Sequence, residues 1–348
     1  MSIAMTFFRR LRFSRRSFYA LTVFALAFAA GPVAADDLPA RCQGTDMLAE
    51  MQVKQPTLFD KIMAESKATS NTEAMLWKVE KAGIPASYLF GTMHLSDTRI
   101  TELPAAAVDA IAHSKSVALE VADLSPEAVA AAMAKAAGLI VYTDGSSLKS
   151  ALSSDDYNKV ERIVVKSGMP GELAAMMKPW LVSMLLATSD CERKQIASGK
   201  VVLDLRVAAE AKKAGITVTG LETIEGQLRA LASIPDDQQV AILKVELDYL
   251  SRADDMMETM VQMYVKRQIG AAMPFQLALA AKSGTSPDAF DGFKKALLID
   301  RNAGMRDAAL PLLEKGNAFV AIGALHLPGP TGLVALLRES GYTVTPIE

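Results

Sequence analysis

Histidine and cysteine are scarce in this chain of 348 residues, which contains three histidines and two cysteines. The sequence has no HExxH helix, no paired CxxC motifs, no Gly-x-Ser-x-Gly nucleophile elbow and no glycine-rich phosphate loop. These absences exclude the zincin proteases, the cysteine-ligated zinc modules, the serine α/β-hydrolases and the P-loop nucleotidases.

Basic residues are outnumbered by acidic ones over most of the chain. Residues 1–35 carry five arginines and no acidic residue, which leaves 32 basic against 39 acidic side chains in the rest, a net charge of −7. A nucleic-acid-binding protein needs a basic face, so we expect no nucleic-acid partner. Hydrophobic residues make up 51% of the chain and charged residues 22%, which excludes a disordered protein.

The first 35 residues have the three-part layout of a secretory signal. Arginines between Arg9 and Arg16 precede an apolar run, Tyr19 to Ala30, and small residues follow at 33–35. The run is shorter than the roughly 20 residues of a membrane span. We therefore predict a signal peptide over 1–35, a periplasmic or secreted mature chain, and no stable membrane span after cleavage. Residues 14–18 (SRRSF) leave both Sec and twin-arginine export open.

The two cysteines are Cys42 and Cys191. In an oxidising compartment an even pair is most simply one disulfide. A catalytic or metal-binding thiol is the alternative, but neither cysteine has a second cysteine nearby in the sequence. We therefore predict that Cys42 and Cys191 are bridged.

The remaining pattern is that of an α/β protein. We expect a helical lead-in with helices at 56–66 and 71–81, and then strands that alternate with helices. The expected strands are 88–90, 116–121, 201–203, 216–221, 318–322 and 342–347. Residues 125–200 and 233–299 read as helical insertions. The sequence thus predicts a single α/β domain over 36–348, with a mostly parallel sheet, helices on its faces and a large helical cap.

A duplicated motif is the most informative feature of the sequence. Residues 88–95 (YLFGTMHL) match residues 320–327 (VAIGALHL), and each segment is an apolar strand followed by Gly-x-x-His-Leu. Two of the three histidines, His94 and His326, thus occupy the same position of the motif. Ligands bind beyond the carboxyl ends of parallel strands, where Gly91 and Gly323 allow the backbone to turn sharply.

A carboxylate completes this constellation, because Glu120 ends the apolar segment Val117 to Leu119. An acidic group in such a run is costly unless it is paired or bound to a cation. Two histidines and one carboxylate form a common set of ligands for a catalytic divalent metal. We predict that His94, His326 and Glu120 hold a metal, with acid–base roles for the histidines as the alternative.

Two alternative roles are open for each of three further polar residues. Arg301 offers a planar fork of donors, suited either to a substrate carboxylate or oxyanion or to a salt bridge that orients Glu120 or Glu222. Glu222 is interpreted as a general base or as a group that orients the site, with capping of the next turn as the alternative. We expect Asp204 to cap a helix rather than bind a ligand.

Two other groups of residues point to ordinary roles. Methionines at helical spacing, as in 256–263, are expected to pack in the core or a substrate groove, with copper binding as the alternative. His113 is expected at the surface.

Several motifs together resemble the TraB/GumN family, which includes conjugation-pheromone shutdown proteins and is similar to the animal Tiki metalloproteases. They are the paired Gly-x-x-His motifs, residues 118–120 (ALE), residues 220–223 (GLET) with Gln227, residues 300–302 (DRN) and residues 323–329 (GALHLPG). The resemblance covers roughly residues 85–348. One position departs from the family pattern, since Gly226 stands where a glutamate is common.

This resemblance implies a fold shared with the erythromycin-esterase and haem-binding ChaN-like groups. It also implies a divalent metal of the manganese or cobalt type, with zinc as an alternative, and peptide hydrolysis. The matching positions are Gly91, His94, Glu120, Gly323 and His326. Three more positions match the family's Leu-Glu-Thr and Arg-Asn elements, and we carry them over as catalytic candidates with Glu120: Glu222, Arg301 and Asn302.

We therefore expect an exported divalent-metal-dependent hydrolase that acts on a peptide or small-molecule substrate. One alternative is a non-catalytic periplasmic protein that sequesters a peptide or a haem-like ligand. Another is a metal-free hydrolase of the esterase-like kind that uses a histidine base. The oligomeric state, the metal and the physiological substrate do not follow from the sequence.

Overall fold

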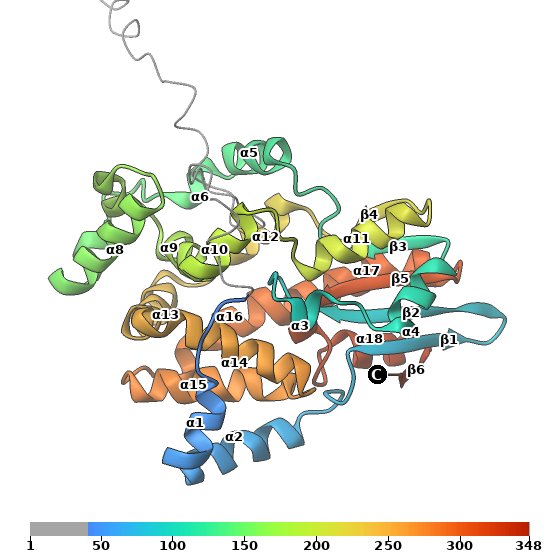
Figure 1. Cartoon of the computed structure of the whole chain (residues 1–348). Helices are drawn as coiled ribbons and strands as arrows, with labels where there is room; N and C mark the ends of the chain where they lie inside the picture. The colour runs from blue at the N-terminus through green and yellow to red at the C-terminus, as the bar shows by residue number, and fades with distance from the viewer. Residues whose placement is uncertain (1–40, 348) are drawn as a thin grey trace, which may run out of the picture.

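The structure is a computed structural model that describes residues 41–347. The predicted signal peptide, 1–35, lies outside the described residues. A six-stranded sheet with the order β4-β3-β5-β2-β1-β6 forms its centre (Figure 1). The strands are β1 (Leu76–Lys81), β2 (Ile84–Thr92), β3 (Ser116–Leu119), β4 (Val218–Gly220), β5 (Ala318–Gly323) and β6 (Thr343–Pro346).

The parallel part of the sheet carries both Gly-x-x-His motifs. Strands β4, β3, β5 and β2 pair in parallel, and β1 pairs antiparallel with both β2 and β6. Strand β5 lies between β3 and β2, and its residues 318–322 are almost completely buried. The predicted α/β fold with a mostly parallel sheet is therefore confirmed.

Two predicted elements of secondary structure were wrong. The segment 71–81, predicted as a helix, contains strand β1, which forms a hairpin with β2. Gly83 takes a positive φ of 78° in the turn, and the large side chain of Trp77 is fully buried. The predicted strand 201–203 is not formed, because Leu203 instead begins a helix.

Helices surround this sheet, and the long insertions are helical as expected. The α-helices are α1 (Met47–Lys54), α2 (Pro56–Ala68), α3 (Thr98–Thr101), α4 (Ala105–Ala112), α5 (Pro126–Lys135), α6 (Ala137–Ile140), α7 (Leu148–Ala151), α8 (Ser154–Lys166), α9 (Pro179–Leu186), α10 (Asp190–Ala197), α11 (Leu203–Lys213), α12 (Ile224–Ala232), α13 (Asp236–Asp248), α14 (Ala253–Val265), α15 (Ala272–Lys282), α16 (Asp291–Phe293), α17 (Asp300–Leu313) and α18 (Leu333–Glu339). Within the described residues, no helix is both long and apolar enough to cross a membrane.

Two large hydrophobic cores organise these elements, and a small third one lies between α13, α15 and the turn η5 (Pro287–Phe290). The first surrounds the sheet and includes residues of α1, α2, α4, α11, α14, α15, α17 and α18. The second joins α5, α8, α9, α12 and α13, which we call the cap (Figure 1). The chain returns to the sheet between the two insertions, through α11 and β4. That all these segments form one domain stays a prediction.

A disulfide joins Cys42 to Cys191, as the sequence predicted. It links the segment before α1 to helix α10, across a sequence separation of 149 residues. A cross-link of that span restricts the unfolded chain strongly, because it closes a long loop.

Replacing both Cys42 and Cys191 by serine should therefore lower the free energy of unfolding by about 4–5 kcal/mol, which is the loop-closure entropy of such a span. Equilibrium denaturation by urea, with wild type in the presence and absence of reductant as the reference, measures this change. Equal stability of the variant and the oxidised wild type would contradict the prediction.

Candidate active site

The buried carboxylate of Glu120 is the centre of the candidate site. It follows strand β3, and 6% of its side chain is exposed. Its Oε1 accepts a hydrogen bond of 2.6 Å from the Gly323 backbone N–H. Its Oε2 accepts bonds from Arg301 Nη2 at 2.6 Å and Gln227 Nε2 at 3.1 Å. Burial favours the neutral acid, but His326, His94 and Arg301 outweigh it and lower the pKa of Glu120 to about 2.

His94 follows strand β2, and an acidic residue of helix α11 holds its ring. His94 Nδ1 lies 2.8 Å from Asp204 Oδ2, and Asp204 Oδ1 accepts a hydrogen bond of 2.6 Å from Thr92 Oγ1. The Asp204 charge raises the pKa of His94 to about 9, against the opposing effect of burial. Nearly half of the His94 side chain, 49%, is exposed, so a substrate can reach it.

The structure corrects our reading of Asp204 as a helix cap. Helix α11 begins at Leu203 with Val202 as its N-cap, so Asp204 lies in the first turn and its carboxylate points to His94 instead. Its acidic charge in the first turn is favourable to the helix in any case. An acidic residue near the start of a predicted helix is consistent with both roles, because the N-cap of α11 and Asp204 are only two positions apart.

His326 is held in the same way from the other strand. It lies in the short 3-10 turn η7 (Ala324–His326) after β5, and its Nδ1 is 2.7 Å from Asn302 Oδ1. Asn302 Nδ2 donates to the Thr331 carbonyl at 2.8 Å, which fixes the amide so that its oxygen faces the imidazole. His326 Nδ1 therefore carries the proton in that bond. Burial lowers the pKa of His326 to about 4.

The pairing of β2 with β5 explains why the duplicated motifs meet. Gly91 lies opposite Ile322 and Thr92 opposite Gly323 in the parallel ladder, so both histidines follow adjacent strands at the same level. A Cβ atom added to Gly91 would lie 2.6 Å from Leu327 Cδ1. Tyr264 also donates a hydrogen bond of 2.6 Å to the Gly91 carbonyl. A larger residue at position 91, which lies inside strand β2, would therefore force the buried Leu327 side chain to shift.

Gly323 marks the point on which the expected ligands converge. A Cβ atom added there would lie 3.0 Å from Glu120 Oε1, 3.5 Å from His326 Cδ2 and 3.9 Å from His94 Nε2. His326 Nε2 is itself 3.7 Å from Glu120 Oε1. The structure thus brings together the three residues that the sequence selected.

These three ligand atoms are more widely spread than a compact metal site requires. In the described part of the chain, the group of three histidine, cysteine or acidic ligand atoms that lies mutually within 4.8 Å is that of Cys42, Cys191 and Asp254. Its two sulfur atoms already form the disulfide. The site at Gly323 is therefore arranged around hydrogen bonds to Glu120.

Arg301 bridges Glu120 and Glu222, which agrees with the interpretation of Arg301 as a salt-bridge partner. Its Nε and Nη2 donate to the Glu222 carboxylate at 3.0 Å and 2.6 Å, and Nη2 also reaches Glu120. Gln227 Nε2 connects the same two carboxylates, at 3.1 Å each. Thr223, rather than Glu222, caps helix α12. The fork of Arg301 is thus occupied by protein groups.

Arg301 and Asn302 lie in the first turn of helix α17, which begins at Asp300 directly after a π-helical turn, η6 (Lys294–Ile299). Such turns shift the register of a helix and occur often at functional sites. Here the shift precedes the two residues that hold Glu120 and His326. The sequence named both residues through the family resemblance, whereas Gln227 entered only as part of a motif and Thr92 was missed.

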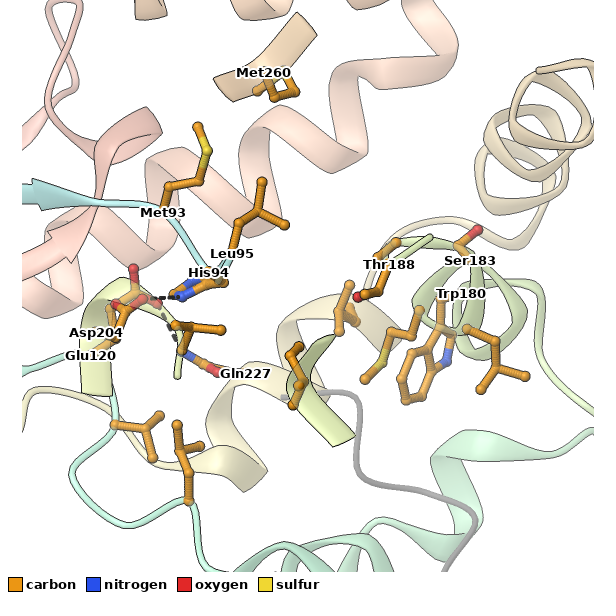
Figure 2. Close-up of a pocket in the computed structure, with 18 of the residues that line it drawn as sticks. Met93, His94, Leu95, Glu120, Trp180, Ser183, Thr188, Asp204, Gln227 and Met260 are labelled. Carbon is orange, nitrogen blue, oxygen red and sulfur yellow. Dashed lines mark hydrogen bonds and ion pairs between the residues drawn. The ribbon is translucent and has the colours of Figure 1, made fainter. Parts of the chain in front are cut away.

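A cavity of about 430 Å³ opens beside this cluster and runs into the cap. Figure 2 shows His94, Glu120, Asp204 and Gln227 grouped at one end, and Trp180, Ser183 and Thr188 at some distance from them. Methionines line part of the wall, including Met257 and Met260, as expected for a substrate groove. His113 is exposed at the end of α4, as expected for a surface residue.

Fold and site together define a class of α/β protein with two matched imidazoles at the carboxyl ends of adjacent parallel strands. The model of the TraB/PrgY/gumN family matches residues 75–346, and the chain belongs to this family. The expected resemblance is thereby confirmed.

Curated relatives include metalloproteases. The chain is 24% identical to metalloprotease TIKI2 of Danio rerio over 78% of this chain and 60% of that protein, and 24% identical to metalloprotease TIKI1 of Homo sapiens over 79% and 62%. It is 22% identical to the uncharacterized protein YbaP of Escherichia coli (strain K12), over 72% and 87%. The chain thus spans about 60% of the length of the Tiki relatives. No solved structure matches it significantly.

The Asp204→Asn variant should lower the pKa of His94 from about 9 towards the ordinary value of 6.5, because the charge that stabilises the imidazolium is removed. Nuclear magnetic resonance titration of the ring Cε1–H signals in metal-free protein measures this shift. Assignment is straightforward, since the chain has three histidines. An unchanged His94 titration would show that Asp204 does not control its charge.

Proposed function

We propose that this protein is a divalent-metal-dependent hydrolase that cleaves peptides, with the ion held by His94, His326 and Glu120. One observation carries the proposal: two imidazoles and a buried carboxylate, supplied by adjacent parallel strands, converge around Gly323. The metalloprotease relatives support the same reaction class.

The chemistry of the donor set fits a divalent ion. Each imidazole donates its Nδ1–H to a fixed acceptor, Asp204 or Asn302, which makes Nε2 the nitrogen that would bind the ion. Glu120 is anionic and supplies oxygen. Nitrogen and oxygen donors without thiolate suit manganese, cobalt or zinc.

When bound, such an ion would supply a Lewis acid that polarises a peptide carbonyl and makes water more acidic. The protein groups around it have positioning roles. Asp204 and Asn302 orient the imidazoles, while Arg301 and Gln227 hold one oxygen of Glu120. Glu222 orients Arg301 and is committed to that ion pair, so we assign it a positioning role rather than that of a general base.

A metal-free hydrolase with His94 as general base is the second candidate, and the 2.8 Å contact of His94 with Asp204 favours it. The charge state of the ring argues against it. The Asp204 charge raises the pKa of His94 and favours the protonated ring, whereas a general base must be neutral. In the metal-dependent reaction His94 would instead be a neutral ligand that binds the ion through Nε2, while Nδ1–H stays bonded to Asp204.

We also propose that the protein acts outside the cytoplasm. The disulfide between Cys42 and Cys191 supports this location, because such bonds persist in oxidising compartments. The expected signal peptide and the route of export belong to the same proposal.

Removal of any one ligand, by His94→Ala, His326→Ala or Glu120→Gln, should weaken Mn²⁺ or Co²⁺ binding by more than about 100-fold, which exceeds the effect of losing a group that only orients a ligand. Hydrolysis of a decapeptide library should fall in parallel, and double variants should lose little more. Isothermal calorimetry measures the affinity and mass spectrometry the cleavage.

The exposed His113→Ala variant is the matched control and should behave as wild type, with circular dichroism to verify folding. Metal-independent cleavage that depends on His94 alone would favour the second candidate. Peptide binding without cleavage, with or without metal, would favour a sequestering protein and contradict the proposal.

A further inference from the structure

The cavity extends well beyond the residues that the proposed reaction uses. Trp180 and Ser183 of helix α9 lie far from the His94 cluster (Figure 2), and helix α13 of the cap also lines the cavity, through Ile242 and Glu246. Most of its wall is apolar, with leucine, isoleucine and methionine side chains. A wall of this kind favours an apolar portion of a ligand, because its burial removes hydrocarbon from water.

One acidic group interrupts this apolar wall. Glu246 lies on α13 and lines the cavity, and its Oε2 is buried without a hydrogen-bond partner among residues 41–347. Burial raises the pKa of Glu246 to about 7, although a hydrogen bond from Ser183 acts in the opposite direction. Gln239, on the same helix, differs because its Oε1 accepts the Trp180 backbone N–H at 3.2 Å.

The carboxylate of Glu246 has no partner of opposite charge in the described part of the chain. None of the ion pairs there includes it, and Arg193, which also lines the cavity, is paired with Asp190 instead. A buried carboxylate stays ionised only when a partner of opposite charge is present, and a cationic ligand in the cavity would be such a partner for Glu246. The rings of Trp180 and Phe293 line the same cavity, and aromatic faces attract cations.

We propose that the cap cavity binds an apolar segment of a peptide that carries a primary ammonium group, and that Glu246 binds this group. The inference rests on the proposed peptidase function and names its substrate class. The apolar wall excludes a fully hydrated ion and selects a cation attached to hydrocarbon. Both a lysine side chain and a free α-amino terminus supply that chemistry.

Binding to metal-free protein tests this proposal without any turnover. The probes are hexylamine and 1-hexanol, which share a hydrocarbon chain and differ in charge. Trp180 lines the cavity, whereas Trp77 is fully buried in the sheet core, so a change in tryptophan fluorescence reports occupation of the cavity. A Trp180→Phe variant should abolish the signal and thereby assign it.

We expect wild type to bind hexylamine at least about tenfold more tightly than hexanol, the ratio given by one charge-assisted hydrogen bond. Glu246→Gln should abolish this preference while hexanol affinity stays within about twofold. Asp248→Asn is the matched control, because Asp248 is exposed on the same helix and its loss removes the same charge. Equal affinities of wild type for amine and alcohol would overturn the proposal.

Short peptides then distinguish the two sources of the ammonium group. The parent peptide is Ala-Leu-Ala-Lys amide, compared with its N-acetyl form and with a version that has norleucine in place of lysine. Loss of affinity on acetylation identifies an amino terminus, and loss with norleucine identifies a lysine side chain. Equal affinity of all three would overturn the proposal.

The binding test of Glu246 and the test of the hydrolase proposal can fail independently of each other. Amine selectivity that depends on Glu246 supports this site even if no peptide is cleaved, in which case the hydrolase proposal alone fails. Cleavage that shows no preference for a cationic group and is unchanged in Glu246→Gln overturns this inference and leaves the hydrolase proposal intact.

Discussion

The rest of the site depends on one constraint, the burial of an ionised carboxylate at the end of strand β3. Glu120 is almost inaccessible to water, and its charge is balanced by Arg301 and by the hydrogen bonds from Gln227 and Gly323. Removing one partner of a buried charge commonly costs about 3–5 kcal/mol. The carboxylate of Glu120, at the end of β3, therefore links strand β5 and helices α12 and α17 through its hydrogen bonds.

The position of this carboxylate also explains the location of the cavity. The parallel strands end between the two hydrophobic cores, and the cap lies against those ends, so the site opens into a largely apolar space rather than directly into solvent. His326 is buried on the sheet side, whereas His94 is half exposed, lines the cavity and is paired with Asp204. The two imidazoles thus have similar sequence contexts, and their pKa values are shifted in opposite directions.

The sequence predicted the parallel sheet and the convergence of His94, His326 and Glu120, because strand–Gly–x–x–His is a local pattern and parallel strands share one edge. It did not predict the β1–β2 hairpin, since a short amphipathic run such as 71–81 fits either periodicity. Asp204 was misread because its partner is 110 residues away. Glu246 was missed because a lone glutamate in a helical segment carries no signal until the cap surrounds it.

The most direct test of the metal centre is anomalous X-ray diffraction from crystals grown with Co²⁺, recorded on both sides of the cobalt absorption edge. The account predicts one strong anomalous peak bonded to Nε2 of His94 and of His326 and to an oxygen of Glu120, and no such peak in crystals of His326→Ala. Diffraction from well-ordered crystals with saturating Co²⁺ and no peak between the two imidazoles would contradict it.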